Sequence, residues 1–429
     1  MSTKKVLQAR REDLGLPWLA RSRFRERNGS QVADWAENLS ALAAVFLSPM
    51  NFLRLPFFYF TLSDAFACIC LFILVLRGRL RFDPIGAVPT VVWLLGLCML
   101  LTGLLVSSMI NGDPLRGTVY IVQYFFAYFI LLVVIGSSDR QRLLLMSKVY
   151  VASILLMCLH GAYVINIVAE TNTTFVSGSG RLTGFVEREN ECSALIALSV
   201  PMLLTFCFGR GSSKLGLLAL PFMGYGVMLT GSNTGLASFL LGVGLFCALT
   251  LNVKLLAPIG ALGAILIVIV ERWGRDYLPV AFQRRVLGAL ESGDLDQAGS
   301  FQHRVQLIHE AIGRTKDTFL FGLGADQYAL TSVLTQPVHN LYLLLWTEGG
   351  FLSMVGFIVM IGASFGPALS AWQQPGGRHL AASAICTVCL FLFLINAFPS
   401  VYGRFWAMPI ILTVALANTC RYQSSRRMR

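Results

Sequence analysis

A histidine stands where a polar segment of the chain becomes apolar, in the stretch QPVHNLYLLLWTEGG from Gln336 to Gly350. Histidine has an ordinary pKa near neutral, so His339 could take a proton from a hydroxyl group. Alternatively, His339 only caps a helix or lies at a membrane interface, where Tyr342 and Trp346 form an aromatic belt. Composition alone slightly favours this second interpretation.

An acidic residue follows inside the apolar part of the same stretch. Glu348 lies a turn or two into that part. An ionisable group inside a membrane span is costly to bury, and this makes it a functional candidate. Glu348 requires a partner or a shared proton, which indicates a polar pocket.

Two arginines precede a long apolar run in GRLTGFVERENECSALIALSVP. Asn190 could cap the helix predicted here, and Glu191 in its first turn would suit the helix dipole. Those roles do not account for Arg181 and Arg188, which lie beside a helix N-terminus, the end that attracts anions. For Arg181 a phosphate site and a structural role have equal weight, whereas for Arg188 the structural role is favoured.

A third arginine begins an amphipathic pattern in GSFQHRVQLIHEAIG, where Val305 and Ile308 recur at helical spacing. Arg304 falls in the first turn, where a cation opposes the helix dipole, so we interpret it as retained for an anionic ligand. His303 and His309 are interpreted as ordinary polar groups. The glycines of the following FGLG are expected to end this helical segment and turn the chain back to the membrane.

These residues are embedded in a strongly apolar chain. Of its 429 residues, 55% are hydrophobic and 13% are charged, and the mean hydropathy is +0.67. Soluble proteins carry about 25% charged residues, and several apolar runs here reach the roughly 20 residues that cross a bilayer as a helix. We predict an all-α polytopic membrane protein with about twelve transmembrane helices, at 36–53, 59–77, 86–108, 118–136, 147–169, 190–208, 215–231, 234–251, 254–271, 339–365, 380–398 and 405–420.

The basic residues predict the orientation of these spans. Basic tails at 1–35 and 421–429 flank the transmembrane domain 36–420, and basic tails prefer the cytoplasm. The short loops RGRLR, SDRQR and GRGSSK then also lie inside, and the long loop 272–338, which contains the amphipathic helix, lies outside. That loop has seven basic and seven acidic residues, so the net charge of +12 comes mostly from the cytoplasmic side. It indicates topology and attraction to anionic lipid, and nucleic-acid binding is not expected.

Other chemical signatures are missing from the sequence. The ten cysteines fall almost entirely in apolar runs, and the sequence contains no zinc-type Cys/His spacing, no Walker loop and no dinucleotide fingerprint. We therefore expect no metal site, no cofactor and no nucleotide hydrolysis in this chain.

The order of these motifs resembles the O-antigen ligase and O-antigen polymerase superfamily of bacterial envelope glycosyltransferases. The ordered set is GRLTGFVERENECSALIALSVP, the turn TGSNTGLASFLLG, a large loop with HRVQLIHEAI and FLFGLGADQY, and then HNLYLLLWTEGG. The resemblance covers roughly residues 38–420. Its strongest single match is His339 and Gly350, with ten residues between them.

This resemblance implies glycosyl transfer at the periplasmic face of the bacterial inner membrane. A glycan would pass from an undecaprenyl-diphosphate carrier to an acceptor hydroxyl, without a nucleotide sugar and, in the ligases, without a metal ion. His339 would be the base, Arg304 and Arg181 would stabilise the diphosphate, and Glu348 would orient the site. Expected partners are the lipid-linked oligosaccharide, an acceptor glycan or lipid A core, and membrane lipid, with chain-length regulator and flippase proteins as further candidates.

One position departs from the family pattern. The ligases usually carry an arginine in the Ser-containing turn, where this chain has Asn233, an uncharged hydrogen-bonding residue. This departure favours a polymerase of exopolysaccharide or O-antigen repeats over a lipid A core ligase. It also leaves open which arginine supplies the missing charge. The candidate residues for binding the diphosphate or glycan are Arg181, Arg188, Asn190, Asn233 and Arg404, the last of these in the final outer loop.

A transporter or flippase of lipid-linked glycan is the competing class. Twelve spans with both termini inside would suit it. Transporters, however, usually place charged residues near mid-membrane and often have related halves. Here the halves look dissimilar and the ionisable groups gather at one face, which favours chemistry at the interface.

Overall fold

The computed structural model describes residues 17–55, 59–209, 214–250, 260, 278–288, 301–399 and 401–427. Within these residues the chain forms helices and two isolated β-bridges, with no strand, and this confirms the predicted all-α class. The α-helices are α2 (Pro17–Leu47), α3 (Leu62–Leu76), α4 (Ala87–Ile110), α5 (Pro114–Phe125), α6 (Leu131–Gly136), α7 (Arg140–Tyr163), α8 (Glu189–Phe208), α9 (Ala219–Thr230), α10 (Asn233–Thr250), α12 (Val280–Phe282), α14 (Phe301–Arg314), α15 (Tyr328–Thr331), α16 (Leu341–Gly362), α17 (Phe365–Trp372), α18 (Arg378–Leu394) and α19 (Arg404–Arg427). The 3-10 and π-helical turns are η1 (Phe126–Ile130), η2 (Val164–Val168), η3 (Gly184–Val186), η4 (Lys214–Leu218) and η5 (Gln283–Leu287).

Six helical segments of the described chain are long and apolar enough to cross a membrane. They are Ala87–Ile110, Pro114–Gly136, Arg140–Val168, Glu189–Phe208, Asn233–Thr250 and Leu341–Trp372. Shorter apolar helical segments occupy Leu62–Leu76, Lys214–Thr230 and Arg378–Leu394. These segments indicate a polytopic membrane protein. The predicted span 254–271 lies outside the described residues, so the count of twelve stays a prediction.

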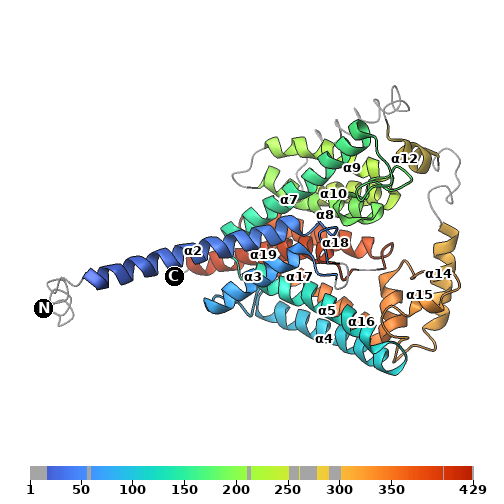
Figure 1. The fold of residues 1–429 in the computed structure, drawn as a ribbon, viewed down its shortest axis with the longest axis horizontal. Coiled ribbons are helices and arrows are strands. Elements are labelled where there is room, and N and C mark those ends of the chain that lie inside the picture. The colour runs from blue at the N-terminus through green and yellow to red at the C-terminus, as the bar shows by residue number, and fades with distance from the viewer. Residues whose placement is uncertain are drawn as a thin grey trace.

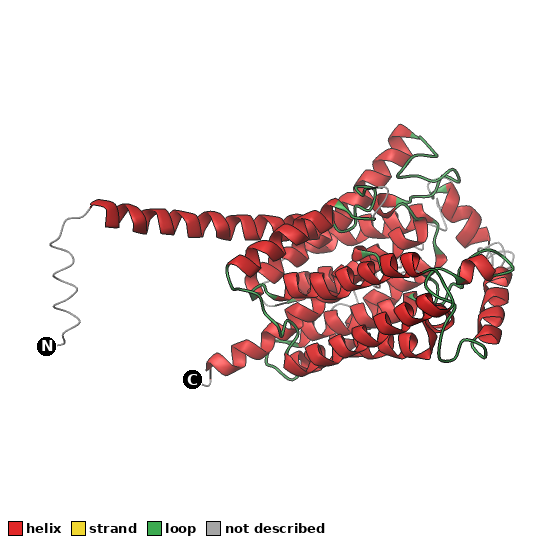
Figure 2. Ribbon diagram, turned by 60° about the horizontal axis from the view of Figure 1, so that its bottom comes forward, coloured by secondary structure: helices red, strands yellow, loops and turns green. Residues whose placement is uncertain are grey.

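The helices run between two ends of an elongated bundle. The first turns of α2 and the last turns of α19 project from one end, and α14 and α15 cover the other end (Figure 1). In the turned view, most of the long helices lie alongside one another between these ends (Figure 2). The predicted orientation with both termini on one side is compatible with this arrangement and stays a prediction.

Polar residues at the helix N-termini set where several of these helices begin. Thr61 and Asp64 form a reciprocal capping box at the start of α3. Asp113 accepts hydrogen bonds from two backbone amides of α5, and Pro114 occupies its first position, where no amide is needed. Asp139 caps α7 in the same way. The hydroxyl and carboxylate groups thus stabilise helix ends that would otherwise expose unpaired amides.

Helix α2 begins at Pro17, inside the predicted basic tail 1–35. Two acidic residues on it have basic partners: Asp34 and Glu37 accept from the Arg77 guanidinium at 2.7 and 2.9 Å. The loop RGRLR, which we used as an orientation signal, therefore also fastens α2 to the end of α3.

Helix α16 is broken within its length. Gly350 has φ of 73° and ψ of 177°, so the predicted continuous helix 339–365 consists of two helical parts. The opened backbone pairs with a neighbouring non-helical segment, because the amide of Phe351 donates to the carbonyl of Phe319 at 2.9 Å. Backbone groups in a membrane environment must be paired within the protein, and this pairing satisfies that requirement.

We expected the sequence FGLG to end the amphipathic helix, and this was wrong. Helix α14 already ends at Arg314, before FGLG. The segment instead lies between α4 and α16. The amide of Gly322 donates to Ser107 Oγ of α4 at 2.8 Å, and the carbonyl of Gly322 accepts from Asn111 Nδ2 at 2.9 Å. A Cβ at Gly322 would collide with the backbone of Glu348. Glycine is therefore needed for this close approach.

Candidate active site

Arg181 is held in a fixed position by three groups. Its side chain is buried, its Nε donates to the carbonyl of Thr230 at 2.7 Å, and its Nη2 donates to Asn190 Oδ1 at 3.1 Å. Glu189 Oε1 lies 3.5 Å from Nη1. Burial lowers the pKa of Arg181 to about 10, the Glu189 carboxylate opposes this shift, and the charge of Arg285 adds to it. The guanidinium is still protonated at neutral pH.

Asn190 does not cap α8, although the sequence allowed that role. The N-cap residue is Arg188, with an extended backbone and no side-chain cap, and Asn190 lies within the first turn. Asn190 therefore orients Arg181 instead of capping the helix. The Arg188 side chain is largely exposed, and its Nη1 lies 3.8 Å from Glu191 Oε1.

Arg304 lies on the buried face of α14. Leu307 and Ala311, three and seven residues further on, lie on the same face and are fully buried. They pack against Val338 and Leu344, so this face meets the start of α16 and the segment before it. Burial, together with the charge of Arg285, lowers the pKa of Arg304. The Nε of Arg304 is buried and has no hydrogen-bond partner among the described residues.

His339 directly precedes the N-cap of α16. The cap is Asn340, whose Oδ1 accepts from the amide of Leu343 at 3.0 Å. This confirms the expected helix start near His339 or Asn340. His339 is half-buried, and burial lowers its pKa to about 4, with further lowering by the charges of Arg304 and Arg188. The imidazole is therefore neutral at neutral pH, which is the state of a base that can accept a proton.

The sequence analysis did not single out Arg285, which the structure adds to this group. It lies in the π-helical turn η5, and its charge acts on both Arg181 and Arg304. Asn233, at the start of α10, donates from Nδ2 to the carbonyl of Arg285 at 3.4 Å. An arginine in an unremarkable polar stretch carries no sequence signal of its own, so only the fold identifies it.

Glu348 lies apart from these residues. It is nine positions after His339, a rise of about 13 Å along a helix, and is not among the charges that act on the histidine. Its Oε1 accepts from the amide of Tyr328 at 3.2 Å. In this arrangement Glu348 anchors the first residue of α15 to α16, two positions before its break at Gly350.

Arg404 is also separate from the cluster. Its Nε donates to Asp64 Oδ1 at 2.8 Å, and both residues are buried. Its guanidinium lies over the ring of Phe126, 5.5 Å from the centroid. The contacts join the first turn of α19 to the start of α3 and to η1.

We expect Arg404→Gln to destabilise the protein by about 3 to 5 kcal/mol, because it leaves the Asp64 carboxylate buried without its charged partner. Thermal unfolding of the protein in detergent measures this. The control is Arg116→Gln, which breaks an exposed ion pair of 3.0 Å to Asp326 and should cost about 1 kcal/mol or less. A ligand-binding role for Arg404 requires the opposite result, namely loss of transfer activity with an unchanged melting temperature.

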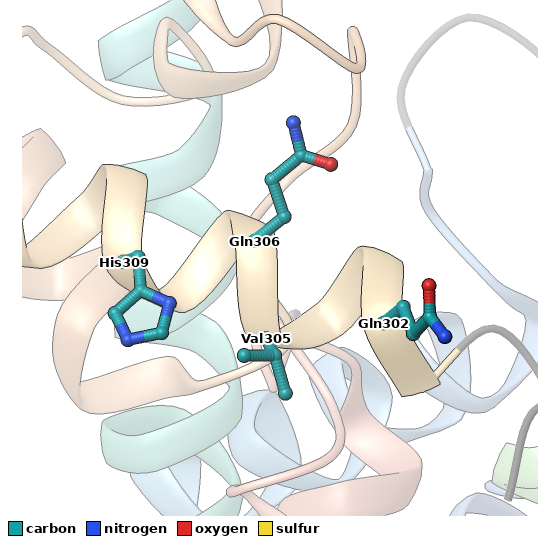
Figure 3. A pocket seen from close by; sticks show the side chains of 4 residues that line it. All are labelled: Gln302, Val305, Gln306 and His309. Atoms are coloured by element: carbon teal, nitrogen blue, oxygen red, sulfur yellow. The ribbon is translucent and has the colours of Figure 1, made fainter.

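A surface pocket of about 440 Å³ lies on another face of α14. Its lining side chains, Gln302, Val305, Gln306 and His309, all project from this helix (Figure 3). Their spacing puts them on the side of the helix opposite to Arg304. The pocket has no charged arginine in its lining, so we do not assign the anion-binding chemistry to it.

The charges of Arg304 and Arg188 act on His339, whereas Arg181 is linked to this group only through Arg285, whose charge acts on both Arg181 and Arg304. Fixed guanidinium groups form strong, often bidentate hydrogen bonds to phosphate oxygens. A neutral imidazole beside them can accept a proton from a hydroxyl group. The arrangement can bind a phosphorylated ligand and deprotonate a nucleophile next to it. Among the described residues, no group of three His, Cys, Asp or Glu side chains could hold a metal ion.

A comparison with protein families found a match. Residues 218–358 match the family described as O-Antigen ligase. This range includes Asn233, Arg304 and His339, while Arg181 and Arg188 precede it. No match to the chain was found among curated proteins. The family match supports a glycosyltransferase of the ligase or polymerase type, acting on a lipid-linked glycan and an acceptor. Residues 218–358 are therefore similar to the O-antigen ligase family, and this match supports the resemblance to the O-antigen ligase and polymerase superfamily.

Proposed function

We propose that this protein polymerises undecaprenyl-diphosphate-linked oligosaccharide repeats into a surface polysaccharide, an exopolysaccharide or O-antigen, at the periplasmic face of the bacterial inner membrane. The observation that carries the proposal is the packing of the Arg304 face of α14 against Val338 and Leu344, on either side of His339, whose pKa is lowered by burial and by the charges of Arg304 and Arg188. A cationic group and a base side by side suit a reaction in which a diphosphate leaves while a hydroxyl attacks.

The proposed step transfers one glycosyl group. The acceptor hydroxyl oxygen attacks the anomeric carbon of the donor glycan, and its proton passes to the imidazole of His339. The bond between the anomeric carbon and the phosphate oxygen breaks, and its electron pair stays with the leaving undecaprenyl diphosphate. Arg304 and Arg181 bind the charge that develops on the diphosphate. Release of the proton from His339 to water restores the base.

Asn233 favours polymerisation over transfer to lipid A core. The resemblance to the ligases would place an arginine at this position, and here the Asn233 amide instead holds the Arg285 carbonyl. The second candidate function is ligation to lipid A core, which the description of the matched family favours. Transport of the glycan has less support, because Arg304 lies on α14, which covers one end of the bundle (Figure 1) and packs against the start of α16, beside His339.

The test compares the glycans of a strain lacking the gene with those of the same strain carrying the wild-type chain. Envelope and medium are extracted separately and the glycans are resolved by size. We expect loss of long polymer, with single repeats left on the carrier or the core, and restoration by the wild-type gene.

Two other outcomes would contradict polymerisation. Full-length polymer that accumulates on the undecaprenyl carrier and is missing from lipid A core would identify a ligase. Lipid-linked repeats that stay accessible only from the cytoplasmic side of the membrane would identify a flippase.

A further inference from the structure

Two neighbouring arginines in the η5 turn have different environments. Arg284 is exposed, whereas Arg285 is half-buried. The start of the turn is fastened, since the buried Phe282 precedes it and Gln283 Nε2 donates to the carbonyl of Leu278 at 2.8 Å. Only one of the two side chains therefore faces the protein. A π-helical turn is an uncommon conformation that is often found at functional sites.

The short turn between α9 and α10 holds two arginine-bearing segments at once. Thr230, the last residue of α9, accepts from the Arg181 guanidinium at 2.7 Å. Asn233, the first residue of α10, donates to the backbone carbonyl of Arg285 at 3.4 Å. Gly231 lies between them with φ of 56°, a left-handed conformation that glycine adopts without strain. One turn thus fixes the side chain of Arg181 and the backbone of Arg285 relative to each other.

We propose that Arg285 is a further diphosphate-binding residue of this site and that Asn233 positions it through its backbone. This inference rests on the proposed function. It assigns to Arg285 the positive charge that the ligases usually carry at the position of Asn233. Arg285 acts electrostatically on Arg181 and on Arg304, which come from different segments. Guanidinium groups from several segments suit a multiply charged anion, and a diphosphate is such an anion.

The test measures binding of inorganic pyrophosphate to the full-length protein in lipid nanodiscs by calorimetry. Pyrophosphate is the probe because it shares the leaving group and needs no knowledge of the sugar. Arg285→Gln is expected to raise the Kd by roughly 10- to 100-fold, the effect of losing a hydrogen bond to a charged group. Arg284→Gln removes the same charge from the adjacent exposed position and should change the Kd less than about 2-fold. Arg285→Lys, which keeps the charge and loses the fork geometry, should fall between the two.

A double-mutant cycle tests the positioning role of Asn233. Asn233→Ala should weaken pyrophosphate binding in the wild-type background and have little further effect in Arg285→Gln, because Asn233 acts only by positioning the Arg285 guanidinium, which Arg285→Gln already removes. Equal Kd values for the Arg284→Gln and Arg285→Gln proteins would overturn the proposal, and so would wild-type protein that binds no pyrophosphate. Failure of the proposed function is distinguishable, since it appears as wild-type protein that binds pyrophosphate and transfers no lipid-linked glycan.

Discussion

Replacing His339 by glutamine is expected to lower the rate of glycosyl transfer by about 10²- to 10⁴-fold, the usual loss when a general base is removed. Glutamine keeps a side chain of similar polarity but cannot accept the proton of the acceptor hydroxyl. The assay uses lipid-linked glycan extracted from the deletion strain and purified full-length protein, and follows product size over time. Binding of the donor should persist, because the arginines that hold the diphosphate are unchanged.

The matched control is His309→Gln. His309 lies on the exposed face of α14, in the pocket opposite to Arg304 (Figure 3). This substitution removes an imidazole from the same outer region and should leave the transfer rate within about 2-fold of wild type, as is usual for exposed positions. If both variants transfer glycan at the same rate, His339 is not the base.

Much of the fold follows from simple patterns in the sequence. Apolar runs of sufficient length predict the membrane helices, and Asn340 after Pro337 predicts the start of α16. The break at Gly350 could not be predicted in this way. It depends on segment 319–325, whose backbone supplies the partners for the opened helix, and contacts between segments far apart in sequence leave no periodic pattern.

The candidate site residues were chosen from the sequence by residue type and position, and their arrangement required the fold. An arginine in the first turn of an amphipathic helix opposes the dipole, and this local conflict singled out Arg304. Glu348, chosen because it lies inside an apolar run, and Arg404, chosen from the final outer loop, have partners within the fold: the amide of Tyr328 for Glu348 and Asp64 for Arg404. A charged side chain that is costly to bury in a membrane protein can serve the structure as well as the function. Only tertiary contacts distinguish the two.

The substitution Arg304→Gln is expected to have the second large effect, a fall in kcat/KM of about 10²-fold or more. The guanidinium lies on the buried face of α14, where an electrostatic contribution to the leaving diphosphate is less screened than at the surface. Lys316→Gln is the control, because it removes one positive charge from an exposed position just beyond the same helix.

The pH profile separates this role from a purely structural one. Burial and the charges of Arg304 and Arg188 hold the pKa of His339 near 4, below its ordinary value of 6.5. Removing Arg304 takes away a charge that disfavours the imidazolium, so the pKa of His339 rises toward 6.5. A base works only when deprotonated, and the acid limb of kcat/KM should therefore move to higher pH in Arg304→Gln. Lys316→Gln should keep the wild-type limb. An unshifted limb in Arg304→Gln would mean that the two groups do not share a site, because a charge that acts on His339 in the free enzyme must change its titration when removed.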